Sequence, residues 1–467
     1  MTRLALVSTF LLCAVIAGAA DAGRPGRWDV VASGASAPAV SQELGVARTG
    51  DGSLHVAWRE GFEAIRARTI TAAGALGPVS TVVSGWSLGA DPTLVPAAGV
   101  RAFFAGVTPV EGLNTSTALA ASGAWSAPTL VDDREFARGR TAGAALHASG
   151  APLLTWYSAG DIVVRSGVSP GAPLHTLTAG GSNTRPNVAA DAAGNALVAW
   201  CEFTGPTRGV FVRRVAGDGA PSGEAVKLPG STTTDASGVP QAACVLESTV
   251  SRREPIVARA GGGFFVAGTS GYPSLDRVLV WRLDPSGGVV STAVVAGSTR
   301  LSFSEPAIAA APDGRIWVAW LEPAGAGKRI VARRSNRTGT IFGAPVRALP
   351  PGGLAVGTVN VDAQVDRVDV LAIAQGITGE RTVQHTQLLP GLTIVRTSLV
   401  RRRGSASVTF RVLDAGDPVA GARVRAAGRS GVTNARGTVT LTVRRGGTAT
   451  ATRAGYVAAS TRFGCCR

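Results

Sequence analysis

The stretch Asp191-Ala-Ala-Gly-Asn-Ala-Leu-Val-Ala-Trp200 is one copy of a short unit that recurs along the chain. The unit reads Asp51-Gly-Ser-Leu-His-Val-Ala-Trp58 near the N-terminus and Asp313-Gly-Arg-Ile-Trp-Val-Ala-Trp320 further on. Asp and Gly favour the backbone angles of a tight turn, and the apolar run that ends in Trp has the period of a β-strand. Each copy therefore predicts a turn followed by a strand, and the recurrence predicts a repeat architecture.

The copy around Trp200 belongs to a longer unit of four predicted strands. These strands cover 187–190, 196–200, 209–215 and 223–228 and show the two-residue alternation of half-buried strands. Four short strands per repeat are typical of a β-propeller blade. The same order predicts seven units, at 44–83, 91–131, 140–177, 184–228, 254–296, 304–349 and 354–388.

The last of these units has no clear fourth strand of its own. The segment Arg27-Trp-Asp-Val-Val-Ala-Ser33 is similar to the fourth strands of the first two units, at 78–83 and 126–131. We therefore expect the N-terminal strand to complete the last blade, which closes the ring and removes exposed sheet edges. The tryptophan that ends each second strand is expected to pack between blades, because large aromatic side chains usually fill cores.

The predicted fold class is all-β: a seven-bladed β-propeller, its last blade closed by the N-terminal strand, followed by a small β-sandwich at 405–463. The sandwich is predicted from alternating runs at Val408–Val412, Thr438–Val443 and Thr448–Arg453. The 61 glycines and 26 prolines among 467 residues are typical of many short strands joined by tight turns, with few helices.

The two ends of the chain differ in character from the middle. Residues 1–20 combine Arg3, an apolar run over 4–17 and small residues at 18–20, which predicts a secretory signal peptide; the run is too short to span a bilayer comfortably. Residues 393–467 hold 14 arginines and two acids, a net charge of +12 out of +16 for the chain. We expect a signal peptide at 1–20, a propeller at 24–392 and an Arg-rich sandwich at 393–467, in a secreted monomer with no further membrane segment.

Export makes disulfides possible, and four cysteines follow residue 20, which allow three pairings. In a propeller, the connection after a second strand and the connection into the next blade open on the same face. Cys201 lies in the first kind of connection, and Cys244 lies in the long one at 229–253. A Cys201–Cys244 disulfide is therefore predicted. Cys465 and Cys466 can form a vicinal pair, stay reduced or link two chains.

Two family resemblances follow from these motifs. The Trp units resemble the Asp-box or BNR-type repeats of secreted bacterial propellers of the sialidase-like superfamily, with a shifted Asp–Gly spacing, over about residues 28–390. The string Asp417-Pro-Val-Ala-Gly-Ala-Arg-Val424, then Asn434 and Gly437, then Ala454-Gly-Tyr456, resembles bacterial Ig-like or carboxypeptidase-regulatory-like domains. The first resemblance implies a fold, and the second implies a spacer or adhesive module.

Four residues are candidates for a ligand face of the propeller. Glu60, Glu202 and Glu322 each follow a unit tryptophan by two residues, and the next strands carry arginines at 66, 68, 213, 214, 333 and 334. They are interpreted either as ion pairs repeated in each blade or as a polar cluster at one mouth of the ring that binds a cation or sugar. Tyr272 is either a candidate nucleophile of the sialidase type or the cover of a turn.

No other pattern in the sequence indicates catalysis or a cofactor. The Arg-Ile-Pro signature of sialidases is absent, the four histidines lack the spacing of metal ligands, and no cysteine pair has zinc-type spacing. We therefore assign no catalytic residue, no metal site and no cofactor from the sequence.

The tail arginines form the second candidate surface. Those that should point outwards are Arg401, Arg402, Arg403, Arg411, Arg423, Arg425 and Arg444. A cationic surface attracts anionic glycans, wall polymers or lipid head groups, whereas export and the lack of interleaved aromatic residues disfavour nucleic acid; the alternative is Arg-rich composition alone.

The function favoured by the sequence is that of a secreted, non-catalytic binding or adhesion protein. The propeller would be a platform for a ligand or protein partner, and the basic sandwich would dock it to anionic cell-envelope material. The alternative is a sialidase-like glycoside hydrolase or lyase that acts on extracellular glycans.

Overall fold

A computed structural model describes residues 26–118, 123–134, 142–178, 180, 183–203, 207–234, 237–246, 252–271, 274–325, 327–353 and 355–465. The predicted signal peptide and Tyr272 lie outside these residues. Within them, antiparallel strands dominate, and the helical elements are α1 (Ala243–Leu246), η1 (Gly34–Ser36) and η2 (Pro351–Gly353). None of the described helices has the length and apolar character needed to cross a membrane. The all-β prediction is confirmed.

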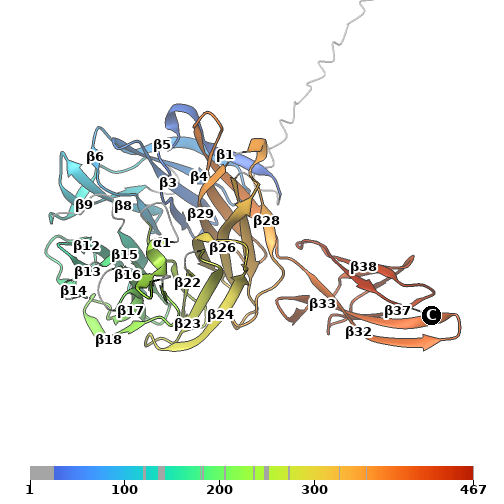
Figure 1. The fold of residues 1–467 in the computed structure, drawn as a ribbon. Coiled ribbons are helices and arrows are strands. Elements are labelled where there is room, and N and C mark those ends of the chain that lie inside the picture. Colours follow the sequence, from blue (N-terminus) through green and yellow to red (C-terminus); the bar gives the residue numbers. More distant parts are fainter. Residues whose placement is uncertain are drawn as a thin grey trace, which may run out of the picture.

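Seven antiparallel sheets of four or five strands follow one another between Trp28 and Leu388 of the described chain (Figure 1). We number them sheets 1 to 7. Sheet 1 consists of β2 (Gly45–Arg48), β3 (Leu54–Glu60), β4 (Ala64–Ile70) and β5 (Leu76–Ser84). Sheet 2 consists of β6 (Ser87–Leu88), β7 (Thr93–Pro96), β8 (Val100–Thr108), β9 (Gly112–Ala118) and β10 (Thr129–Asp132). Sheet 3 consists of β11 (Gly143–Leu146), β12 (Pro152–Ser158), β13 (Asp161–Ser166) and β14 (Leu174–Thr176).

The next three sheets have the same order of strands. Sheet 4 consists of β15 (Asn183–Ala190), β16 (Ala196–Glu202), β17 (Gly209–Val215) and β18 (Pro221–Lys227). The hairpin of β19 (Thr232–Thr234) and β20 (Pro240–Ala242) follows it. Sheet 5 consists of β21 (Ile256–Ala258), β22 (Phe264–Ser270), β23 (Arg277–Leu283) and β24 (Val289–Gly297). Sheet 6 consists of β25 (Ser304–Ala310), β26 (Ile316–Ala324), β27 (Gly327–Arg334) and β28 (Val346–Ala348).

Sheet 7 joins the two ends of the ring. It contains β29 (Ala355–Ala363), β30 (Val368–Gln375) and β31 (Arg381–Leu388), and its outer strand is β1 (Trp28–Ala32). β1 pairs antiparallel with β31, with Trp28 opposite Thr386, as the sequence predicted. The first strands of neighbouring sheets contact one another in cyclic order from β2 round to β29, and β29 contacts β2. This is the arrangement of a β-propeller.

Each pair of neighbouring sheets shares a hydrophobic core, including sheets 7 and 1. Trp58 packs between sheets 7 and 1, Trp200 between sheets 3 and 4, and Trp320 between sheets 5 and 6. All three are almost completely buried. The prediction that the unit tryptophans pack between blades is confirmed, so they hold the ring together and do not form a ligand site.

The segment 393–463 forms two packed sheets, here called the tail sandwich, which lies beside the propeller (Figure 1). The first sheet contains β32 (Thr393–Arg402), β33 (Ser405–Asp414), β34 (Asp417–Pro418) and β37 (Thr438–Val443). The second contains β36 (Arg429–Val432), β35 (Arg423–Ala426), β38 (Gly447–Thr452) and β39 (Ala459–Phe463). Phe410 and Phe463 meet edge to face between them, with ring centroids 5.4 Å apart.

The tail sandwich begins earlier than the sequence predicted. Arg401 and Arg402 lie within β32, whereas they were expected to precede the first strand, and Arg403 lies in the turn that follows. The reason for the error is that β32 is an edge strand. Of its ten residues only Ile394 is buried, so it lacks the alternation by which half-buried strands are recognised.

Candidate functional site

The inner strands of the ring surround a cavity of about 440 Å³. Its wall is lined by residues of β2, β7, β11, β15, β21, β25 and β29, most of them Ala, Val, Leu or Ile. The charged residues in this wall are Arg48 and Asp362, whose Nε and Oδ2 atoms are 2.6 Å apart. The wall of this central opening therefore consists mainly of aliphatic residues and contains one ion pair.

A buried group of charged side chains lies near the start of the inner strands, and we call it the mouth cluster. Every member is less than a tenth exposed: Glu43, Arg59, Asp91, Arg185, Arg252, Arg253, Glu254 and Glu305. Four arginines thus meet four carboxylates. Burial of so many charges is tolerated only when they are paired, because each one loses its hydration.

Three consecutive residues, Arg252 to Glu254, hold this cluster together. The Arg252 guanidinium lies 2.8 Å from Glu305 of sheet 6 and donates to the Val359 carbonyl of sheet 7. The Arg253 guanidinium lies 3.1 Å from Glu43, which precedes sheet 1.

Further contacts extend the cluster to the remaining neighbours. Arg253 also donates to the Thr93 hydroxyl of sheet 2, and Glu254 lies 3.2 Å from Arg185 of sheet 4. A short segment that contacts four other sheets and the residues just before sheet 1 must cross the axis of the ring. Residues 252–254 therefore fill this end of the central opening.

Two features of the mouth cluster are unfavourable by themselves: the backbone angles of two of its residues and the burial of the Asp91 carboxyl. Arg185 and Glu305 have positive φ angles of 60° and 53°, a conformation that costs non-glycine residues on the order of 1 kcal/mol or more. Burial raises the pKa of the Asp91 carboxyl above its ordinary value, although the charge of Arg59, 2.7 Å away, acts in the opposite direction. The ion pairs thus hold unfavourable geometry in place.

The predicted disulfide between Cys201 and Cys244 is confirmed, with an S–S distance of 2.09 Å. It attaches the connection between sheets 4 and 5 to sheet 4. The Arg185 guanidinium donates to the Cys244 carbonyl, so the disulfide and the mouth cluster are adjacent. Glu254 lies close to both sulfur atoms, but oxidised sulfurs are not thiolate ligands for a metal. Cys465 also takes part in a disulfide, and Cys466 lies outside the described residues.

The three candidate glutamates each have a partner in their own sheet or in a connection between its strands. Glu60 pairs with Arg66, as the first interpretation of the sequence expected. Glu202 accepts from the Thr207 hydroxyl, while Arg213 donates to backbone carbonyls instead. Glu322 is buried and lies 2.6 Å from Arg329 and 3.4 Å from Arg347, not beside the arginines at 333 and 334. The structure thus gives these glutamates local partners in three separate sheets.

One of these glutamates lines a surface hollow. The hollow has a volume of about 430 Å³ and lies where the turns of sheets 1 and 7 meet the segment 34–39. Glu60, Glu380 and Arg381 contribute its charged groups, and alanines and glycines form much of the remaining wall. The hollow thus places one residue that the sequence singled out, Glu60, in the wall of a surface recess.

The tyrosines do not complete a sialidase-like constellation in the described part of the chain. Tyr157 packs against the core between sheets 3 and 4, and Tyr456 packs against the core of the tail sandwich. Tyr272 lies outside the described residues. The buried arginines and carboxylates of the mouth cluster do converge, but they are paired with one another.

The seven predicted tail arginines are all exposed: Arg401, Arg402, Arg403, Arg411, Arg423, Arg425 and Arg444. The six further described arginines of the tail are exposed as well. The two acids of the tail, Asp414 and Asp417, do not neutralise these side chains, because both face the propeller.

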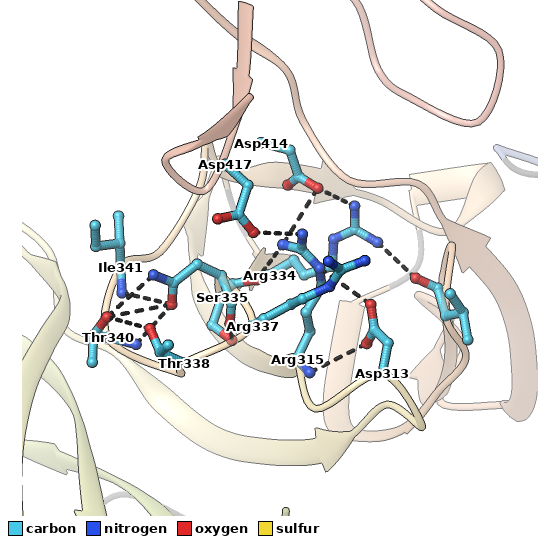
Figure 2. A network of polar contacts seen from close by, with 12 residues as sticks. Asp313, Arg315, Arg334, Ser335, Arg337, Thr338, Thr340, Ile341, Asp414 and Asp417 are labelled. Carbon is cyan, nitrogen blue, oxygen red and sulfur yellow. Dashed lines mark hydrogen bonds and ion pairs between the residues drawn. The ribbon is translucent and has the colours of Figure 1, made fainter. Parts of the chain in front are cut away.

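Figure 2 shows this junction between propeller and tail. Arg315 of sheet 6 lies 2.6 Å from Asp417 and 3.6 Å from Asp414, while Arg334 forms an ion pair with Asp414. The Arg334 guanidinium also stacks between the rings of Trp317 and Tyr456, 5.8 and 5.7 Å from their centroids. At the junction, both acids of the tail therefore form ion pairs with propeller arginines in buried or partly buried contacts.

Comparison with known proteins yields folds but no family. No family model and no curated protein match the chain. Solved structures with a similar arrangement include a prolyl endopeptidase (14% identity, 79% of this chain and 54% of that chain, TM-score 0.41). Another is the polysaccharide lyase Uly1 (11% identity, 75% of this chain and 90% of that chain, TM-score 0.44). A third is the N11 neuraminidase-like protein of A/flat-faced bat/Peru/033/2010 (9% identity, 78% of this chain and 94% of that chain, TM-score 0.39). The chain spans about half of the endopeptidase, and similarities this weak carry no argument about activity.

The sequence prediction missed the mouth cluster, although the sequence contains a signal for it. A charged residue directly before proline opens four of the inner strands, at Asp91, Arg185, Glu254 and Glu305. Charged residues at the start of an apolar strand are common at surfaces, so this pattern alone does not predict a buried cluster. Its recurrence at about the same point of four repeats places these four charges at one end of the ring.

Proposed function

We propose that this protein is a secreted, non-catalytic binding protein of the cell surface. In this proposal the ring is a closed seven-bladed propeller of the sialidase-like type and serves as a platform for a ligand or partner. The tail sandwich is an Ig-like module that docks the protein to anionic envelope material. The export that the proposal requires is consistent with the Cys201–Cys244 disulfide.

The observation that carries the proposal is the division of charge in the tail. All thirteen described tail arginines are exposed, while the two acids are used at the junction with Arg315 and Arg334. The exposed surface of the tail is therefore cationic without local neutralisation. Such a surface attracts polyanions over distances comparable with the Debye length, about 8 Å at physiological ionic strength.

The state of the mouth cluster supports binding over catalysis. A glycoside hydrolase needs carboxyl groups that reach the substrate, about 5–10 Å apart. Here Glu43, Glu254 and Glu305 are buried against Arg253, Arg185 and Arg252. Substrate would have to displace the segment 252–254 and leave several charges without partners. The hollow beside Glu60 is the more accessible place for a propeller ligand.

The proposal is tested with the purified chain on immobilised polygalacturonate, with neutral dextran as the reference surface. We expect retention on the acidic polymer at physiological ionic strength and release as sodium chloride is raised, because ion pairing is screened. Elution at low salt, or equal retention on dextran, would overturn the docking function. Release of reducing ends or unsaturated products from polygalacturonate, or hydrolysis of a sialoside, would instead favour a hydrolase or lyase.

A further inference from the structure

The outer face of the second tail sheet, formed by β35, β36, β38 and β39, carries exposed arginines on regularly paired strands. On its inner side, Val424, Ala426, Ala449 and Ala451 fill the core. Because side chains alternate along a strand, Arg423 and Arg425 of β35 point to the outer side, and both are exposed. We call this outer side the β35 face.

The register of the sheet sets hydroxyl groups beside the arginines of the β35 face. Arg423 lies opposite Thr452 of β38, and Arg425 lies opposite Thr450. Thr450 in turn lies opposite Ser460 of β39, and Thr448 lies opposite Arg462. Neighbouring strands are about 4.8 Å apart, and outward residues of one strand are about 7 Å apart. The face is thus a flat array of guanidinium and hydroxyl donors.

No carboxylate of the described tail balances this array. Arg423, Arg425 and Arg462 form no hydrogen bond or ion pair with any described residue, and both tail acids lie at the junction. Like charges held close together on one sheet face are unfavourable for folding. An anionic partner bound to this face would offset the repulsion.

We propose that the β35 face binds an extended acidic polysaccharide, whose carboxylates accept from the three arginines and whose oxygens accept from the neighbouring hydroxyls. This inference rests on the proposed docking function and assigns it to one face and one class of ligand. Guanidinium groups match carboxylates in geometry, and a flat sheet suits a chain that runs across several strands.

The composition of the β35 face argues against other polyanions. It carries no aromatic side chain on which single-stranded nucleic acid could stack. Val432 is its one large apolar residue that is strongly exposed, at 59%, which is little for insertion into a lipid surface. The outer face of the other tail sheet carries Arg402 and Arg411 among threonines, serines and the exposed Val395 and Val400. These arginines serve as control positions that carry the same charge elsewhere on the tail.

The decisive experiment compares two triple variants that remove the same charge. The first is R423Q/R425Q/R462Q, on the β35 face, and the second is R402Q/R411Q/R444Q, elsewhere on the tail. All six side chains are exposed and lack polar partners among the described residues, so both variants should keep the unfolding temperature of the parent chain. Binding to polygalacturonate is measured for both at the same ionic strength.

We expect the first triple to weaken binding at least about tenfold and the second no more than about threefold. A third variant, T450V, keeps the charge and removes one hydroxyl, and should weaken binding about two- to fivefold. Equal losses of binding in the two triple variants would show that the β35 face is not the binding site, while the docking function would still stand. A parent chain that does not bind polygalacturonate would overturn the docking function itself. Tighter binding to single-stranded DNA or to phosphatidylserine vesicles, lost in the first triple, would overturn the polysaccharide as occupant.

Discussion

The mouth cluster and the tail sandwich use arginine in opposite ways. In the mouth cluster, Arg185, Arg252 and Arg253 are buried, and each has a carboxylate within about 3 Å. In the tail, the described arginines are exposed, and the available carboxylates are taken by another part of the molecule. The same residue type therefore holds a ring together in one region and leaves charge available to solvent in the other. Burial and pairing, rather than composition, distinguish the structural arginines from those that can bind.

The largest expected effect comes from breaking a buried pair of the mouth cluster. Arg252→Met removes the guanidinium 2.8 Å from Glu305, a carboxylate that is fully buried. We expect a loss of about 3–5 kcal/mol in the free energy of unfolding, measured in urea, because a buried charge loses its partner. The double variant Arg252→Met/Glu305→Gln should lose less. Exposed Arg411→Met should stay within about 0.5 kcal/mol, and equal effects at the two sites would refute the distinction.

The junction is the place where the two regions meet, and it should give the next largest effect. Asp414→Ala leaves buried Arg334 without its carboxylate, and we expect a loss of about 3 kcal/mol. Asp417→Ala is the matched change, because Asp417 is 38% exposed, and it should cost less than about 1 kcal/mol. Calorimetry and limited proteolysis of the linker at 389–393 measure whether the tail loosens. A tail that stays as protected in Asp414→Ala as in the parent would show that the aspartate does not anchor it.

A pH titration tests a buried pair outside the mouth cluster, at the seam between sheets 7 and 1. Burial by itself raises the pKa of Asp369, but His385, at 2.8 Å, and Arg48, at 2.6 Å, lower it to about 2. A carboxyl group whose pKa is lower in the folded than in the unfolded chain stabilises the fold at pH values above its unfolded pKa. This stabilisation is lost as the pH falls through its folded pKa. The contribution is about 2 kcal/mol, present above about pH 4 and lost towards pH 2.

The matched variant for this titration is Asp369→Asn, which cannot ionise. It should remove the pH dependence of stability that belongs to this group between about pH 4 and pH 2, as followed by urea unfolding at each pH. If the variant and the parent chain lose stability in parallel over this window, Asp369 is not the group responsible.

The smallest effect is expected at the hollow beside Glu60. Glu60 and Arg66 are 25% and 28% exposed, so their ion pair is largely screened by water. Glu60→Gln should change the free energy of unfolding by less than about 1 kcal/mol. A double-mutant cycle with Arg66→Gln measures the coupling. A coupling above about 2 kcal/mol would place this pair with the buried arginines rather than with the exposed ones.

The local features of the fold were predictable from the sequence, whereas the contacts across the ring were not. A turn and an alternating strand depend on consecutive residues. The copies around Trp58, Trp200 and Trp320 therefore predicted the sheets and the packing of these tryptophans between them. The partner of Arg253 is Glu43, separated from it by 210 residues. No local pattern encodes such a pair, because it depends on how many repeats close the ring.

The candidate site shows the same limit. The exposure of the tail arginines followed from alternation within single strands, as at Arg423 and Arg425. The use of Asp414 by Arg334 joins segments 80 residues apart, and this contact is what leaves the tail without accessible acids. The glutamates at 60, 202 and 322 each follow a repeated tryptophan, but this repetition does not encode their partners.

The pairing of β1 with β31 has a consequence for the order in which the chain is made. The Thr386 hydroxyl donates to the Arg27 carbonyl, and these residues are separated by 359 positions. During synthesis, the first strand of the ring must wait without its partner until nearly the whole propeller has emerged, and closure over so long a loop is slow. Closure of the ring therefore cannot occur before β31 (Arg381–Leu388) has been made.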